Sequence, residues 1–244
     1  MVDFGMKNIL TKGGIEFLAV FLGIALSLWV DEYQKTKESK KLSSQILNRL
    51  YKNLEADSID GIWNQKAHYL VTESGDFILD WCKTTKELTD SVEIHLSRLA
   101  IATTLVNIEE EYNALKSSGR MELLEDENLV TALHDYYSWV KYIKVMQSNI
   151  RGIVVNQYLP FMSNYSEYFG LIKEKNIYDN TYPAFVLHSI PPKNKISHYA
   201  SHLGTYGFYA NEVYKTLMDK VIHLRKLIRH KNRSSSHDVQ VMVK

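Results

Sequence analysis

The chain has 244 residues, of which 45% are hydrophobic and 23% are charged. These values fit one folded domain of ordinary size with a few appendages, and they exclude a disordered or collagen-like chain. The 29 basic and 28 acidic residues leave a formal net charge of +1, so we expect no nucleic-acid partner. Cys82 is the single cysteine. It cannot form an internal disulfide, and we expect it to be a small buried side chain.

The first predicted element is a transmembrane helix at residues 13–30, which follows an N-terminal tail at residues 1–12. From Phe17 to Val30 the chain reads FLAVFLGIALSLWV, without a charged residue. At about 1.5 Å per residue the helix spans roughly 27 Å, close to the thickness of a hydrocarbon core. No small-residue cleavage site follows, so we expect an uncleaved single-pass anchor in a membrane. The alternative is a buried helix of a soluble protein, which would be expected to carry a polar stripe.

Two features of this helix predict contacts inside the membrane. Ala19, Gly23 and Ser27 recur at every fourth position, so they are predicted to let a partner subunit or a second copy pack closely. Glu16 lies near the predicted membrane boundary. It is either an interfacial carboxyl solvated by lipid headgroups, or an ionisable group that faces a partner and serves an ion path or assembly.

The charges around the anchor leave its orientation open. Lys7 and Lys12 precede the apolar run, and several lysines follow it. By the positive-inside rule this distribution slightly favours a cytoplasmic domain. A basic tail before an apolar core also describes a signal anchor that exports the chain behind it.

The rest of the chain is predicted to be all-α, with an extramembrane helical bundle at residues 31–230. An apolar stripe at helical spacing begins at Leu42, and no Gly or Pro stands between Asp31 and Ala56. We therefore expect the anchor helix to continue unbroken into the bundle. Helical patterning goes on to Trp81, and a turn is expected at 83–90.

Beyond this turn the pattern predicts further helices and two irregular stretches. Residues 161–196 contain many aromatic residues and three prolines. We expect a loop or short-helix excursion there that packs on the bundle; an exposed aromatic recognition surface is the alternative. No segment shows the alternation that a sheet requires, and residues 231–244 are predicted to be a flexible tail. The predicted helices are 91–106, 109–116, 127–159 ended by Pro160, and 203–228.

Ser117, Ser118 and Gly119 are predicted to form a tight corner between two helices. Glycine takes the left-handed backbone conformation that often ends a helix, and serines favour such turns. A structural role accounts for these residues. A ligand or partner contact at the corner is the alternative, because loops on rigid scaffolds often carry function.

Two stretches resemble an uncharacterised bacterial family of single-pass, membrane-anchored helical proteins. The first is the anchor, GGIEFLAVFLGIALSLWVDEYQ, although Ile15 separates Gly14 from Glu16 where the family has a Gly-Glu pair. The second is EEYNALKSSGRMELLEDENLVTALHDYY at 110–137. The resemblance implies the architecture and a bacterial inner membrane, but no catalytic residues. The residues in step in the second stretch are Tyr112, Leu115, Ser117, Ser118, Gly119, Leu129, Leu133, Tyr136 and Tyr137.

Catalytic signatures are absent from the sequence: there is no phosphate-binding Gly-rich loop, nucleophile elbow, CxxC pair or zinc-protease motif. His198 and His202 share one helix face and could hold a metal, but no nearby carboxylate completes a set. The acidic run 109–111 is interpreted as a solvated helix face. Basic residues at 225–233 either suit a helix C-terminus or meet anionic headgroups. We expect no enzymatic activity, no cofactor and no bound metal.

The leading hypothesis is a non-enzymatic accessory or scaffold subunit of a membrane protein assembly, with membrane lipid and other membrane subunits, or a second copy, as partners. One alternative is a membrane-bound sensor domain that acts through a partner, because the chain has no output module of its own. Another is a component of an ion-conducting complex that uses Glu16.

Overall fold

A computed structural model describes residues 3–84, 87–173 and 181–241, and within them the side chains of 16–84, 87–167 and 185–233. The fold is all-α apart from one two-stranded hairpin. Helix α1 (Asp3–Cys82) is a single continuous rod, so the prediction that the helix at 13–30 continues unbroken into the bundle is confirmed. Gly61 and Gly75 do not interrupt it.

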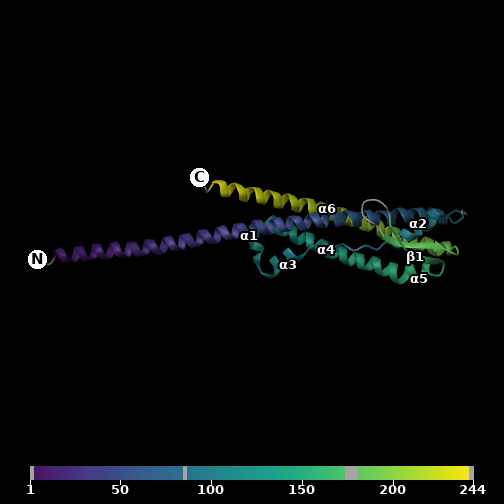
Figure 1. Cartoon of the computed structure of the whole chain (residues 1–244), viewed down its shortest axis with the longest axis horizontal. Helices are drawn as coiled ribbons and strands as arrows, with labels where there is room; N and C mark the ends of the chain where they lie inside the picture. Colours follow the sequence, from purple (N-terminus) through teal and green to yellow (C-terminus); the bar gives the residue numbers. More distant parts are fainter. Residues whose placement is uncertain (1–2, 85–86, 174–180, 242–244) are drawn as a thin grey trace.

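The N-terminal part of α1 projects away from the rest of the molecule (Figure 1). Every described residue from Glu16 to Glu38 is exposed, including Phe17 at 71% and Leu28 at 64%. Burial of one face begins only near Ser43. Over the described residues no helix combines the length and the apolar character needed to cross a membrane, so the transmembrane assignment of 13–30 is not supported.

Three long helices build the bundle. Helix α6 (Lys193–Val241) runs antiparallel to α1, so its end returns toward the N-terminal side (Figure 1). Helix α4 (Glu127–Ile153) packs beside α6, and Asp126 caps its start by accepting a hydrogen bond from the Leu129 amide. The core between the helices holds leucines and fully buried tyrosines such as Tyr136 and Tyr214. An apolar stripe on each helix explains this packing.

Glycines let α1 and α6 approach closely where they cross. A Cβ atom on Gly75 would lie 2.8 Å from the Gly204 Cα and 2.8 Å from the Ala200 carbonyl oxygen. One on Gly207 would lie 2.9 Å from the His68 carbonyl oxygen. Backbone meets backbone here, so side chains larger than hydrogen do not fit.

The predicted helix at 91–106 is wrong in its second half. Helix α2 (Asp90–Arg98) ends early, and residues 101–109 form neither helix nor strand. In that segment Ile101, Thr103 and Leu105 are buried, whereas Thr104 and Val106 are exposed. This alternation is typical of an extended chain with one buried face, and the helical interpretation overlooked it.

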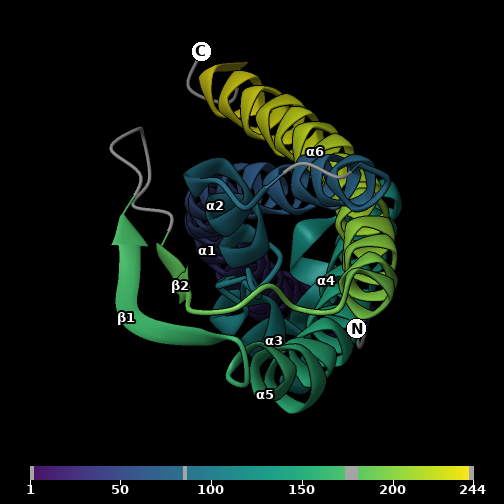
Figure 2. The same ribbon diagram turned by 90° about the vertical axis from the view of Figure 1, so that its right-hand side faces the viewer.

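The predicted absence of a sheet is also wrong. Strands β1 (Ser166–Lys173) and β2 (Thr181–Leu187) form an antiparallel hairpin that lies outside the helices (Figure 2). It is attached to α2, because the Phe185 amide donates to Ser97 and the Leu187 amide donates to Glu93. The predicted loop at 161–196 thus contains a hairpin. Its aromatic side chains at 168–184 lie outside the described residues.

The end of α4 departs from its predicted limit at Pro160. A π-helical turn η2 (Val154–Tyr158) leads into α5 (Leu159–Met162), where Pro160 stands in the first turn. Proline is tolerated there because that position needs no amide donor. Helix α6 is longer than the predicted 203–228, and its backbone is helical through Val241, inside the predicted tail.

The predicted corner at 117–119 is present. Helix α3 (Glu110–Ser117) ends there, and the 3-10 helix η1 (Arg120–Leu124) follows. Gly119 has φ of +69°, and the Ser118 hydroxyl donates to the Ala114 carbonyl at 2.7 Å. The short helix predicted at 109–116 is confirmed within a residue.

Replacing Gly119 by alanine is expected to lower the free energy of unfolding by about 1 kcal/mol, because a Cβ atom strains this left-handed backbone. Space is not the cause, since a Cβ atom on Gly119 would meet nothing within 4 Å. Thermal unfolding followed by circular dichroism measures the loss. Asparagine tolerates the conformation, so Gly119→Asn should lose less, and an equal loss in both variants would contradict the backbone explanation.

Candidate functional site

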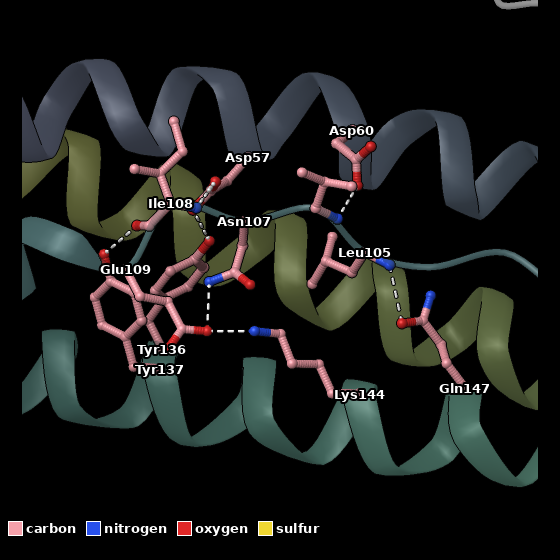
Figure 3. A network of polar contacts seen from close by, with 11 residues as sticks. Asp57, Asp60, Leu105, Asn107, Ile108, Glu109, Tyr136, Tyr137, Lys144 and Gln147 are labelled. Atoms are coloured by element: carbon pink, nitrogen blue, oxygen red, sulfur yellow. Dashed lines mark hydrogen bonds and ion pairs between the residues drawn. The ribbon is translucent and has the colours of Figure 1, made fainter. Parts of the chain in front are cut away.

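The main polar site of the bundle is built around the segment 101–109, which we call the strap. It crosses between α1 and α4 and lies in front of α6 (Figure 3). Among the described residues, no backbone–backbone hydrogen bond joins 102–108 to another segment. Side chains from the helices replace such bonds.

Three helix side chains accept hydrogen bonds from strap amides. The Leu105 amide donates to Gln147 Oε1, the Val106 amide to Asp60 Oδ2, and the Ile108 amide to Asp57 Oδ1, each at 2.9 Å (Figure 3). Buried amides need partners, so these side chains fix the strap in one register along α1 and α4.

Asp57 is the most buried carboxyl of this site. Its Oδ2 accepts a hydrogen bond of 2.6 Å from the Tyr136 hydroxyl, and neither residue is exposed to solvent. Burial raises the pKa of Asp57 to about 6, although the hydrogen bonds from Tyr136 and Ile108 act in the opposite direction. The same burial and the Asp57 carboxyl raise the pKa of Tyr136. The Asp57 carboxyl therefore changes its protonation state near pH 6.

A second polar group lies further along the strap. The Thr103 hydroxyl lies 3.1 Å from His68 Nε2, and the His68 ring stacks on Tyr214 with centroids 5.7 Å apart. Gln147 Nε2 donates to the Tyr214 hydroxyl at 2.6 Å, which joins this group to the strap amides. Burial lowers the pKa of His68 to about 4, so the ring is neutral at pH 7.

A surface groove of about 680 Å³ runs between α1 and the strap. Ile59 and Val106 border it and remain 50% and 69% exposed, although both are large apolar side chains. Trp63 and Ala102 line it, and Asp60 is the charged residue in its wall. The groove is thus largely apolar and carries a carboxylate.

Two hydroxyls of this site contact titratable side chains. The hydroxyls of Tyr136 and Thr103 contact Asp57 and His68, respectively, but the raised pKa of Tyr136 disfavours its ionisation. Over the described part of the chain, no group of three or more His, Cys, Asp or Glu residues is placed to hold a metal. His198 and His202 do share one face of α6, with ring centroids 5.8 Å apart.

The sequence-predicted packing residues Ala19, Gly23 and Ser27 lie on the projecting part of α1, remote from the strap, and so does Glu16. All four are exposed, and a Cβ atom on Gly23 would meet nothing within 4 Å. Their predicted contacts with a partner, and the ionisable role of Glu16, remain predictions.

The corner residues Ser117, Ser118 and Gly119 are also separate from the strap site. The Ser117 and Ser118 hydroxyls both donate to the Ala114 carbonyl at the end of their own helix. These bonds give the two serines a local capping role, and a ligand at the corner remains a hypothesis.

The basic residues of α6 have a structural role that neither sequence interpretation foresaw. Arg225 and Arg229 both donate to the Tyr51 hydroxyl and lie over its ring, and Arg225 pairs with Glu55 at 3.0 Å. Helix α6 continues past these residues to Val241, so they do not lie at its C-terminus. A contact with anionic headgroups stays a prediction.

Sequence reasoning missed Asp57, Asp60, His68 and Gln147 as site residues. One signal was available, because Asp57 follows Leu54 by three positions and so continues the apolar stripe of α1. A carboxyl on that stripe needs a buried partner. The alternation from Ile101 to Val106 was the second signal.

Comparison of the chain with protein-family models, with curated proteins and with solved structures finds no match. The resemblance to a family of single-pass helical proteins therefore stays a prediction. Function has to be argued from the geometry of this chain.

Proposed function

We propose that this protein is a non-enzymatic, membrane-anchored accessory or scaffold subunit, with α1 as both anchor and backbone of the bundle. The observation that carries the proposal is the uncovered apolar segment from Phe17 to Val30. Its large side chains, among them Val20, Leu22 and Ile24, are at least 42% exposed. Leaving such side chains in water costs about 1.5–3 kcal/mol each relative to burial.

Lipid is the cover that best fits the geometry of this segment. Leu18, Val20, Leu26 and Leu28 point to different sides of the helix because successive residues turn by about 100°, and all are exposed. A single protein partner would cover one stripe and leave the others in water. A helix that is apolar on every side is typical of a membrane or of a deep protein core.

The residues that follow support an interfacial boundary near Val30. Trp29 stacks on Tyr33, with ring centroids 6.1 Å apart, and aromatic residues of this kind gather at membrane surfaces. From Asp31 to Lys37 the helix is exposed and largely charged or polar. The proposal thus has α1 leave the membrane at this point and hold the bundle away from it on a polar stalk.

Two arginines in the apolar segment should abolish membrane association. In the variant Leu22→Arg/Ile24→Arg the two charges oppose insertion by about 5–7 kcal/mol together. Sedimentation of cell membranes, washed with carbonate, measures the fraction that stays bound. We expect the unmodified protein in the membrane pellet and the variant in the supernatant.

The matched control places two arginines at the same spacing in the stalk, as Gln34→Arg/Thr36→Arg. Both positions are exposed, so the control should remain in the pellet. If the unmodified chain stays in the aqueous fraction without detergent, the membrane proposal is wrong.

The subunit part of the proposal rests on the small side chains of the same segment. Gly23→Leu should weaken association with a partner helix, because the leucine side chain separates the two backbones. Cross-linking in membranes followed by electrophoresis measures the assembly. Ala25→Leu is the control, since it makes a small-to-large change on the side of the helix away from the small-residue stripe. A protein that remains a lone monomer before substitution would contradict this role.

A further inference from the structure

We propose that the groove between α1 and the strap binds an amphiphilic organic cation, with an apolar body along Ile59 and Val106 and an ammonium group at Asp60. This binding activity goes beyond the anchoring role and does not depend on it. It would make the bundle a ligand-responsive module.

Apolar side chains form most of the walls of the groove. Ile59, Trp63 and Ala67 of α1 face Ile101, Ala102 and Val106 of the strap. Ile59 and Val106 remain at least half exposed, so a ligand there would bury apolar surface that the fold leaves in water. A volume of about 680 Å³ suits a small organic molecule.

The choice of a cation comes from Asp60, the carboxylate in the wall of the groove. Asp60 Oδ2 accepts hydrogen bonds from the Val106 amide and from Asn64 Nδ2, so the carboxylate is held in place before a ligand arrives. Asp60 and Glu109 lie close enough to Asp57 that their negative charges help to raise the pKa of its carboxyl. An ammonium group would relieve this accumulation of negative charge.

Two cations of α4 are engaged by residues of the strap. Lys144 pairs with Glu109, and Arg151 donates to the Thr104 hydroxyl. Both come from α4, whereas Asp60 belongs to α1 (Figure 3). Among the described residues no basic side chain pairs with Asp60, so the α1 wall of the groove presents a carboxylate that favours a positive group over a negative one.

Three probes with one apolar body separate charge from hydrophobic binding: phenylbutylamine, phenylbutanol and phenylbutyrate. Isothermal titration of the full-length protein in lipid nanodiscs, with empty nanodiscs subtracted, measures each affinity. The amine is expected to bind about tenfold more tightly than the alcohol, and the acid most weakly, because a charge-assisted hydrogen bond adds to the apolar contact.

The variant Asp60→Asn should remove the preference for the amine while its side-chain oxygen still accepts from the Val106 amide. Asp76→Asn is the control, because it makes the same change at an exposed position of the same helix. Should Asp60→Asn fail to fold, Ile59→Lys tests the same point, since it places an ammonium group in the groove wall that repels the amine. Equal binding of the three probes, or an amine affinity that neither Asp60→Asn nor Ile59→Lys lowers, would overturn the proposal.

Discussion

Gly75→Val is expected to lower the free energy of unfolding by about 3 kcal/mol, because it forces apart two helices in backbone contact. Even the first added atom would lie 2.8 Å from both the Gly204 Cα and the Ala200 carbonyl oxygen. Those atoms belong to the α6 backbone and cannot rotate away as a side chain would. Helices α1 and α6 form the longest interface of the fold, so the loss would affect the whole bundle.

The measurement is chemical unfolding of the full chain in a mild detergent, followed by circular dichroism. Gly152→Ala provides the control, since an added Cβ atom there meets nothing within 4 Å. Alanine favours helix over glycine, so this control should be unchanged or more stable by up to about 1 kcal/mol. If Gly75→Val unfolds at the same midpoint as the unmodified chain, the close approach of α1 and α6 at Gly75 is contradicted.

The second large effect concerns pH: Asp57 and His68 are expected to change the stability of the protein with pH in opposite directions. Burial raises the pKa of Asp57 from 3.8 to about 6, so the stability that this group contributes is present below about pH 4 and is lost as pH rises through 6. Burial lowers the pKa of His68 from 6.5 to about 4, so its contribution is present above pH 6.5 and is lost as pH falls through 4. Each shift corresponds to about 3 kcal/mol.

Between pH 4 and 6.5 the pH dependences of the two contributions therefore nearly cancel in the unmodified protein. Single substitutions should reveal each of them. When the pH falls from 7 to 4, the free energy of unfolding of Asp57→Asn is expected to decrease by about 3 kcal/mol more than that of the unmodified chain. Of the two groups, only His68 then titrates in this range, because the Asp57 carboxyl is gone. His68→Gln should change stability by a similar amount in the opposite direction. Unfolding free energies measured across this pH range test both.

The double variant Asp57→Asn/His68→Gln is the internal control. It removes both groups, so its difference from the unmodified protein should again be nearly independent of pH. Other carboxyls titrate in the same range, but their effect is common to all four proteins and cancels in the comparison. Parallel pH curves for Asp57→Asn and the unmodified chain would contradict the account of Asp57.

Local sequence patterns were enough to predict the long helices. Residues 31–56 contain no glycine or proline, and an apolar stripe begins at Leu42, so the continuation of α1 followed directly. The corner at Gly119 was also predictable, because a glycine after two serines satisfies a local backbone requirement. In both cases the deciding interactions lie within a few residues of each other in the chain.

The strap and the hairpin could not be predicted in the same way. The strap is fixed by partners far along the chain: Gln147 is 42 residues from Leu105, and Asp57 is 51 residues from Ile108. Pro183 stands inside β2, where proline normally argues against a strand. The hairpin register is also irregular between Tyr168 and Leu171, which breaks the alternation that identifies a strand.

The continuity of α1 has a mechanical consequence for a protein held at one end. Cys82 lies about 78 Å along the helix axis from Val30, and no break or hinge in the helix separates them. If the anchored end tilts by about 20°, an ordinary angle for a helix in lipid, the far tip of the molecule sweeps sideways by about 27 Å. Small reorientations at the base would thus become large displacements at the tip, because α1 is one continuous helix.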